Sequence, residues 1–182
     1  GHKAYSADTA QTWYGVSGEG SVGGLVGYLS EGSAISDSYV WGFTGPRNTN
    51  SLHMGGLVAY IPNVTGDATS VSRCYAMDVT LSGKNLLSET IGNCVATNAT
   101  MDSLWYYNCT LNRGTDGQIY SCPGAVAGTE DTFTSGEAAW NLNAAGGTVT
   151  NSYLWTQGDG APVLRKDGQL GTARVTFQTG SG

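Results

Sequence analysis

The sequence predicts an all-β domain in which a repeated unit stacks into a β-solenoid. Three observations lead to this prediction: a Gly-Gly-Leu-Val segment recurs, the apolar residues form short β-branched and aromatic runs, and the repeats lack helical periodicity. Units of this kind cannot close a core alone, but stacked units can. A β-sandwich or a propeller blade is the competing interpretation, because both are also built from short strands.

The composition agrees with a turn-rich β protein. The 182 residues include 28 glycines but only 12% charged residues, a balance that favours turns and strands over helices. The formal net charge of -6 argues against a nucleic-acid partner, because backbone recognition needs clustered Lys and Arg. No apolar run reaches the length of a membrane-spanning helix, so we expect no membrane insertion.

Each repeat contains two blocks. The first block is found at Val22-Gly23-Gly24-Leu25, at Met54-Gly55-Gly56-Leu57 and, in degenerate form, at Ile91-Gly92-Asn93-Cys94. The second block is found at Ile35-Ser36-Asp37-Ser38-Tyr39, at Val71-Ser72-Arg73-Cys74-Tyr75 and at Tyr106-Tyr107-Asn108-Cys109. A remnant of the second block, Ala4-Tyr5-Ser6, precedes them, so we expect the chain to begin inside a longer array.

Stacking the second blocks predicts columns of equivalent side chains, because neighbouring parallel strands lie about 4.8 Å apart. The expected inward residues are Ile35, Val71, Ser38, Cys74 and Cys109. The expected outward tyrosine ladder consists of Tyr5, Tyr39 and Tyr75. The expected corner column consists of Asp37, Arg73 and Asn108, in which Asp37 and Arg73 form an ion pair across neighbouring coils.

The cysteines have two interpretations. In the predicted register Cys74 and Cys109 are close enough for a disulfide. The interpretation that the sequence favours is that both are buried free thiols, which pack as small hydrophobic side chains. No C-x-x-C pair occurs and the chain has only two histidines, so we expect no metal site.

The two clear repeat copies, GGLVGYLSEGSAISDSYVWG and GGLVAYIPNVTGDATSVSRCYAMDVTLSG, resemble the GLUG motif. Downstream, TSGEAAWNLNAAGGTVTNSYLWTQGDGAPVL is similar to the segment that often closes such arrays in large surface proteins of gut bacteria. The resemblance implies a right-handed parallel β-helix-like fold in a secreted or cell-wall-attached bacterial protein. GLUG repeats accompany adhesins and IgA-degrading metallopeptidases, so the motif indicates an architecture rather than a reaction.

Three segments follow from these patterns. Residues 1–128 are expected to form the GLUG-like coils. Residues 129–164 are expected to form a C-terminal cap with a short helix and a loop, the helix being capped by Thr134 or Ser135. Residues 165–182 are expected to be a linker or the start of a following module.

The sequence favours a non-catalytic module. It contains neither H-E-x-x-H nor G-x-S-x-G, and its acids are mostly scattered singly, so we predict no catalytic residues and no cofactor. The predicted function is adhesion or presentation as a solenoid spacer, linked covalently to neighbouring domains of a larger protein. The sequence leaves two alternatives to this function. The second of them, after carbohydrate binding, is that the chain is an accessory domain of a large extracellular peptidase or glycosidase.

The first alternative is carbohydrate binding. Tyr39 and Trp41 are two positions apart on a predicted strand and Tyr75 stacks beside Tyr39, so an outward aromatic face is expected. Sugar rings stack on such faces, and Asp37 and Arg73 would bind their hydroxyls. The partner would then be a host glycan, or else a host or bacterial surface protein. The opposing interpretation is that another segment covers these rings.

Overall fold

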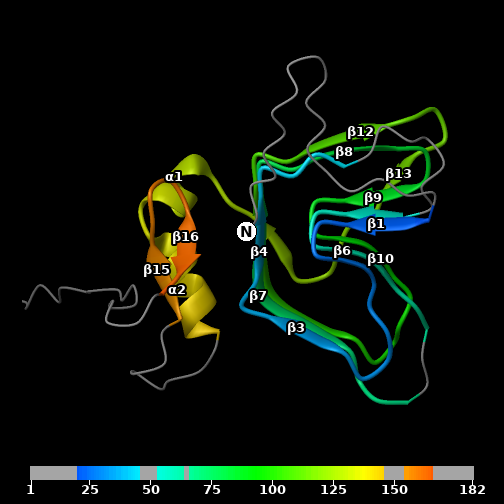
Figure 1. Cartoon of the computed structure of the whole chain (residues 1–182), viewed down its shortest axis with the longest axis horizontal. Helices are drawn as coiled ribbons and strands as arrows, with labels where there is room; N and C mark the ends of the chain where they lie inside the picture. The colour runs from blue at the N-terminus through cyan, green and yellow to red at the C-terminus, as the bar shows by residue number, and fades with distance from the viewer. Residues whose placement is uncertain (1–19, 46–52, 64–65, 146–153, 166–182) are drawn as a thin grey trace, which may run out of the picture. The chain divides into compact units, whose positions relative to one another are not determined.

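The computed structural model describes residues 20–45, 53–63, 66–145 and 154–165. The described part is mostly β, with parallel sheets and two short helices (Figure 1), in agreement with the predicted all-β class. The chain divides into two compact units, Gly1–Thr129 and Glu130–Gly182. Neither described helix has the length and apolar character that crossing a bilayer requires.

In the first unit, the same order of short strands is repeated, and each repetition is here named a pass. The first pass contains β1 (Ser21–Gly23), β2 (Val26–Tyr28), β3 (Ala34–Ser36) and β4 (Tyr39–Trp41). The second contains β5 (His53–Gly55), β6 (Val58–Ile61), β7 (Ser70–Met77) and β8 (Thr80–Gly83). The third contains β9 (Leu86–Ser88), β10 (Ile91–Cys94), β11 (Thr100–Tyr107) and β12 (Thr110–Arg113). The fourth contains β13 (Gln118–Ile119) and β14 (Ala125–Ala127).

Strands at the same position of successive passes pair in parallel. The sheet orders are β1-β5-β9-β13, β2-β6-β10, β3-β7-β11-β14 with β4 also paired to β7, and β8-β12. Figure 1 shows the strands of successive passes layered over one another at each position. Side chains from different passes therefore line up in columns, as in the pairing of Ser21 with His53.

In the first and second passes, a Gly-Gly pair lies where the first strand turns back into the second. A Cβ atom on Gly55 would overlap the Val58 carbonyl oxygen and lie 2.7 Å from the Gly92 nitrogen of the next pass. A Cβ atom on Gly56 would overlap the Glu89 carbonyl oxygen, also in the next pass. Only glycine fits these two positions, because a side chain would displace backbone rather than a flexible neighbour.

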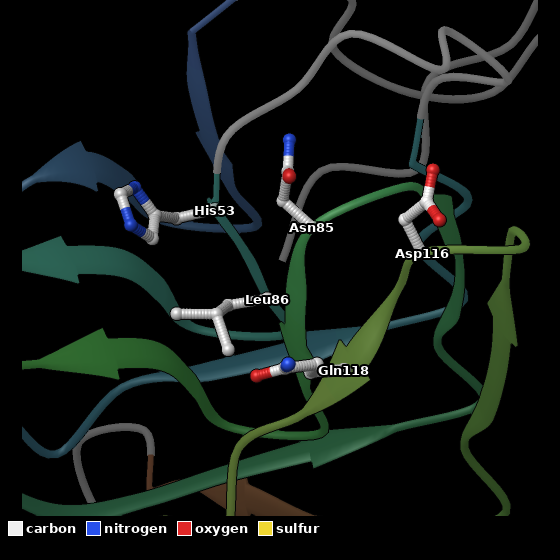
Figure 2. Close-up of a pocket in the computed structure, with 5 residues that line it drawn as sticks. All are labelled: His53, Asn85, Leu86, Asp116 and Gln118. Atoms are coloured by element: carbon white, nitrogen blue, oxygen red, sulfur yellow. The ribbon is translucent and has the colours of Figure 1, made fainter.

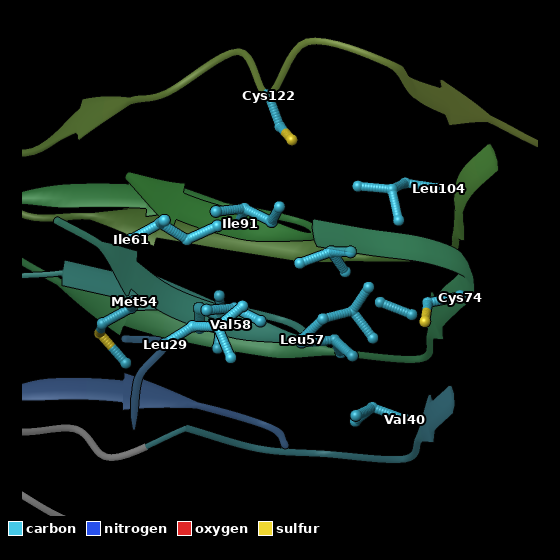
Figure 3. Close-up of a cluster of buried hydrophobic side chains, with 14 of the residues drawn as sticks. Leu29, Val40, Met54, Leu57, Val58, Ile61, Cys74, Ile91, Leu104 and Cys122 are labelled. Carbon is cyan, nitrogen blue, oxygen red and sulfur yellow. The ribbon is translucent and has the colours of Figure 1, made fainter. Parts of the chain in front are cut away.

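The core of the first unit lies between the turned-back strands and β7, β8 and β11. Figure 3 shows Met54, Leu57, Val58, Ile91 and Leu104 directed toward one another, and none of them exposes more than 1% of its surface. Among the predicted inward residues, Val71 and Cys74 are buried in this core, and Ile35 and Cys109 pack against it. Burial of these apolar side chains is the main stabilising term for strands this short.

The predicted register of the third first-block copy is wrong. Gly55 pairs with Ser88, and Val58 pairs with Ile91, so the third turn begins at Ser88 and not at Gly92. Gly92 lies instead on the returning strand, where a Cβ atom would be 2.5 Å from a carbonyl oxygen of β5. The third pass thus retains a glycine for close backbone approach, but at a different position.

Single residues in the left-handed backbone region turn the chain at its corners. Asp37, Arg73 and Ser103 occupy one corner column with φ values of 49, 51 and 53°. The prediction that Asn108 joins this column is wrong, because Asn108 lies at the following corner beside Asp78, with φ values of 51 and 52°. Non-glycine residues adopt this conformation at a cost of about 1–2 kcal/mol, which the pairing on either side offsets.

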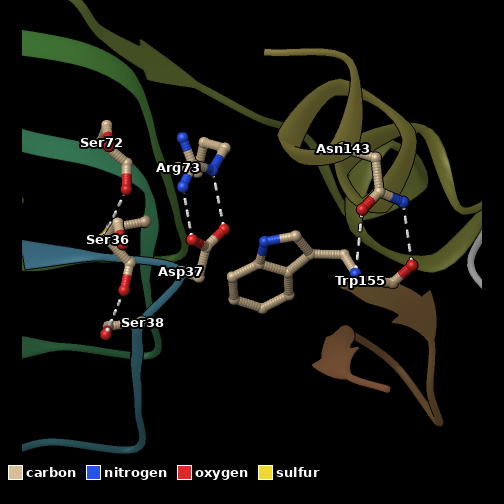
Figure 4. Close-up of polar contacts among 8 residues, drawn as sticks. Ser36, Asp37, Ser38, Ser72, Arg73, Asn143 and Trp155 are labelled. Carbon is tan, nitrogen blue, oxygen red and sulfur yellow. Dashed lines mark hydrogen bonds and ion pairs between the residues drawn. The ribbon is translucent and has the colours of Figure 1, made fainter. Parts of the chain in front are cut away.

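The second unit contains α1 (Glu130–Thr134), α2 (Glu137–Ala144) and an antiparallel pair, β15 (Trp155–Gln157) with β16 (Pro162–Leu164). The expected helix is present, but its N-cap is Gly136, with φ 91°, and not Thr134 or Ser135. Asn143 fixes the helix to β15: its side-chain amide donates to the Trp155 carbonyl oxygen and accepts from the Trp155 nitrogen, each at 2.9 Å (Figure 4).

Candidate functional site

The aromatic residues predicted to bind a ligand lie on the outer face of β4 and β7, and the predicted Asp37 and Arg73 lie at a corner of the chain. Side chains alternate along a strand, so Tyr75 points away from the core to which Cys74 and Ala76 contribute. One column on this face contains Tyr39, Tyr75, Trp105 and Val126, and the neighbouring column contains Trp41, Met77 and Tyr107. The predicted Tyr5 lies outside the described residues.

The two tyrosines of the predicted platform are stacked on each other. The ring centroids of Tyr39 and Tyr75 are 5.1 Å apart and the ring planes are 11° from parallel. Tyr75 has no exposed surface, and this burial raises the pKa of its phenol. In its column Tyr75 lies between Tyr39 and Trp105. The expectation that Tyr75 offers its ring to a ligand is therefore wrong, because the ring has no surface exposed to solvent.

Trp41 is more accessible, with 39% of its surface exposed. Its indole nitrogen donates to a carboxylate oxygen of Asp78 at 2.7 Å. The other carboxylate oxygen of Asp78 accepts from the Asn108 side-chain amide at 2.6 Å. These two bonds join three successive passes, so the polar groups around Trp41 are already used to connect the passes.

The predicted pair of Asp37 and Arg73 forms as expected. Arg73 donates from Nε to Asp37 Oδ1 at 2.8 Å and from Nη2 to Oδ2 at 2.5 Å (Figure 4). The hydrogen bond to Asp37 raises the pKa of the Arg73 guanidinium. Both charged groups are directed at each other across the corner, so the arrangement fixes register rather than presenting groups to sugar hydroxyls.

The alternative of a disulfide between Cys74 and Cys109 is wrong, and the favoured interpretation as free thiols is confirmed. Cys74 pairs with Leu104, while Cys109 lies past the next corner, and all four cysteines are free thiols. The Cys109 thiol donates to the Ala76 carbonyl oxygen at 3.7 Å. Burial raises the pKa values of Cys74 and Cys109 to about 11, so both thiols stay protonated and weakly nucleophilic at neutral pH.

A second candidate binding site was not predicted from the sequence. A hollow of about 310 Å³ is lined by His53, Asn85, Leu86, Asp116 and Gln118 (Figure 2). His53 begins β5 and stacks on Tyr60, with ring centroids 4.4 Å apart. Its place immediately before the Met-Gly-Gly turn was the only local signal. The other lining residues come from the third and fourth passes, which no local pattern joins to it.

No group of three or more His, Cys, Asp or Glu side chains within the described ranges is placed to hold a metal ion. Comparisons of the chain with protein-family models, with curated proteins and with solved structures find no match. The GLUG resemblance therefore rests on the motif residues themselves.

Proposed function

We propose that the chain is a non-catalytic, right-handed parallel β-solenoid module of a large secreted or surface-attached bacterial protein, in which it presents neighbouring domains and contributes to adhesion. The observation that carries the proposal is the in-register pairing of successive passes. Every strand of the second pass pairs in parallel with its counterpart in the third pass. Repeats stacked in this way gain stability from each neighbouring pair, and the array extends along one axis.

The contacts between passes support a structural role. The ion pair of Asp37 with Arg73, the bonds of Asp78 to Trp41 and Asn108, and the Tyr39 stack on Tyr75 all join one pass to the next. Side chains that would otherwise be available to a substrate are thus directed along the stacking axis. Such connections resist sliding between passes, which is the property that a spacer requires.

Immunolabelling tests the proposed location and role. Antibodies raised against the purified module should label intact cells that express the parent protein, and protease treatment of intact cells should remove the label. A cytoplasmic protein of the same cells is the control and should be labelled only after permeabilisation. Labelling of the module that also needs permeabilisation would refute a surface role.

A further inference from the structure

The hollow lined by His53, Asn85, Leu86, Asp116 and Gln118 lies on the outer side of the sheet β1-β5-β9-β13. Its position follows from the register, because His53 pairs with Leu86 and Leu86 pairs with Gln118. In Figure 2 the Leu86 side chain lies between those of His53 and Gln118. Met54 and Leu87, which alternate with His53 and Leu86, are buried in the core. His53 and Leu86 are therefore directed outward, and the exposed Gln118 lies beside Leu86 in the same column.

The aromatic wall of this hollow is held in place. The Ser21 hydroxyl lies 3.3 Å from His53 Nδ1, and the opposing ring of Tyr60 is 9° from parallel to the imidazole. Tyr60 in turn contacts Tyr28 edge to face, with ring centroids 5.7 Å apart. Tyr28 exposes 55% of its surface. The rings of His53, Tyr60 and Tyr28 thus form a continuous row from the hollow to the solvent.

The described lining residues of the hollow include one acidic side chain, Asp116. Burial lowers the pKa of His53 below its ordinary value of 6.5, so the imidazole is neutral at pH 7. Asp116 then carries the one formal charge among the five lining residues. Anionic ligands are disfavoured, because the carboxylate would repel them and no cationic group among these five offsets it.

We infer that this hollow binds a single neutral sugar ring, either a free monosaccharide or the terminal residue of a glycan. Sugar hydroxyls both donate and accept hydrogen bonds, which matches the amide of Gln118 and the carboxylate of Asp116. The apolar C–H face of a sugar ring fits against Leu86 and the imidazole. A small cation fits less well, because the amide N–H groups would oppose it.

The size of the hollow limits the ligand. Its volume of about 310 Å³ is at the lower end of the roughly 300–1,000 Å³ found for small-molecule sites, which suits one ring rather than a chain of rings. This site differs from the aromatic platform predicted on the sequence, which lies on the β4 and β7 face. The inference goes beyond the proposed function, since a spacer does not need a sugar site and a sugar site does not need a surface location.

Saturation-transfer difference NMR on the intact chain tests the inference. The probes are galactose, glucose, mannose, N-acetylglucosamine and N-acetylgalactosamine, each at about 10 mM, with sialic acid as the anionic probe and spermidine as the cationic probe. We expect at least one neutral sugar to receive saturation and sialic acid to receive none. Absence of signal from all five neutral sugars, or a signal from spermidine in place of them, would overturn the inference.

Two substitutions locate the site. Asp116→Ala and Gln118→Ala should each weaken sugar binding at least tenfold. Gln118→Glu is a second variant that keeps the side-chain size and should give the same loss through the removed amide donor. Asp67→Ala, an exposed carboxylate in the loop before β7, and Trp41→Ala, on the other face, are the matched controls and should leave binding unchanged.

Amide spectra of each variant check that the fold is retained. Sugar binding that persists in both Asp116→Ala and Gln118→Ala, or that is lost in Trp41→Ala with the fold intact, would place the site elsewhere and refute the inference. The immunolabelling result has no bearing on these outcomes, so failure of the sugar site and failure of the surface role can be told apart.

Discussion

Cys74 shows at the residue scale how burial sets the chemistry of this chain. Its side chain has no exposed surface, and its thiol donates to the Ser72 carbonyl oxygen at 3.1 Å. Removal from water disfavours the thiolate, which raises the pKa of Cys74 from 9.0 to about 11. The thiol is consequently a packing group, as one of the two interpretations of the sequence proposed.

This pKa predicts how stability depends on pH. Below about pH 9 the thiol is protonated in both states, and its contribution is fully present. As the pH rises from about 9 to about 11, the unfolded state loses the proton first. The free energy of unfolding therefore falls by up to about 1.4 kcal/mol per pH unit. Urea unfolding of the chain and of Cys74→Ala between pH 8 and 10.5 measures this term.

The stability difference between the two proteins should shrink as the pH increases, because only the unsubstituted chain carries the Cys74 thiol. Cys122→Ala is a comparison in which a different buried thiol is removed. A constant difference between the chain and Cys74→Ala across this pH range would contradict the assigned pKa.

The corners are the features that matter at the scale of elements. Arg73 and Ser103 lie in one column with left-handed backbone, but Arg73 also has the ion pair with Asp37. Such an ion pair contributes about 0–1 kcal/mol, which partly offsets the conformational cost. Ser103 has only a hydrogen bond from its hydroxyl to the adjacent Asp102 carboxylate, at 3.2 Å. The strain at Ser103 is therefore the less compensated of the two.

Ser103→Gly should stabilise the protein by about 0.5–1 kcal/mol, because glycine adopts a positive φ without a Cβ clash. In a chain of this size the melting temperature should rise by roughly 1–4 °C. Ser72→Gly is the matched control: Ser72 precedes the corner residue Arg73 on β7, where glycine should lower the melting temperature. Equal shifts of the same sign in both variants would show that backbone strain at the corner is not the cause.

The position of a pass within the stack matters at the scale of the whole molecule. Leu25 and Leu57 follow the Gly-Gly pair in successive passes, so their local sequences are nearly the same. Leu25 is 39% exposed, whereas Leu57 is fully buried between passes. A pass with neighbours on both sides buries apolar residues that an outer pass leaves partly in water.

Leu57→Ala should therefore cost about 2–5 kcal/mol, whereas Leu25→Ala should cost less than about 1 kcal/mol. Chemical denaturation of both variants measures the difference directly. The pair controls for side-chain chemistry and for motif position, since both replace leucine at the same place in the repeat. Similar losses in the two variants would mean that Leu25 is as enclosed as Leu57.

Part of the fold and of the candidate site could be predicted from the sequence. The inward Ile35 and Val71 and the ion pair between Asp37 and Arg73 were predicted correctly. These features come from the two clear repeat copies, in which strong local motifs align without ambiguity. Two predictions were wrong: the alignment of the third copy on Gly92, and the pairing of Cys74 with Cys109. The third pass lacks the Gly-Gly pair that aligns the other two copies.

The sequence by itself determined that this chain is built from repeated short strands and that a Gly-Gly-Leu-Val segment recurs in its two clear copies. Only the tertiary structure decided the register of the third pass, the enclosure of Tyr75 and the grouping of His53 with Gln118. The physical reason is that loops between strands differ in length from pass to pass, so pairing is settled by hydrogen bonds and burial between segments about 30 residues apart. Exposure likewise depends on which side chains the neighbouring passes place beside a residue.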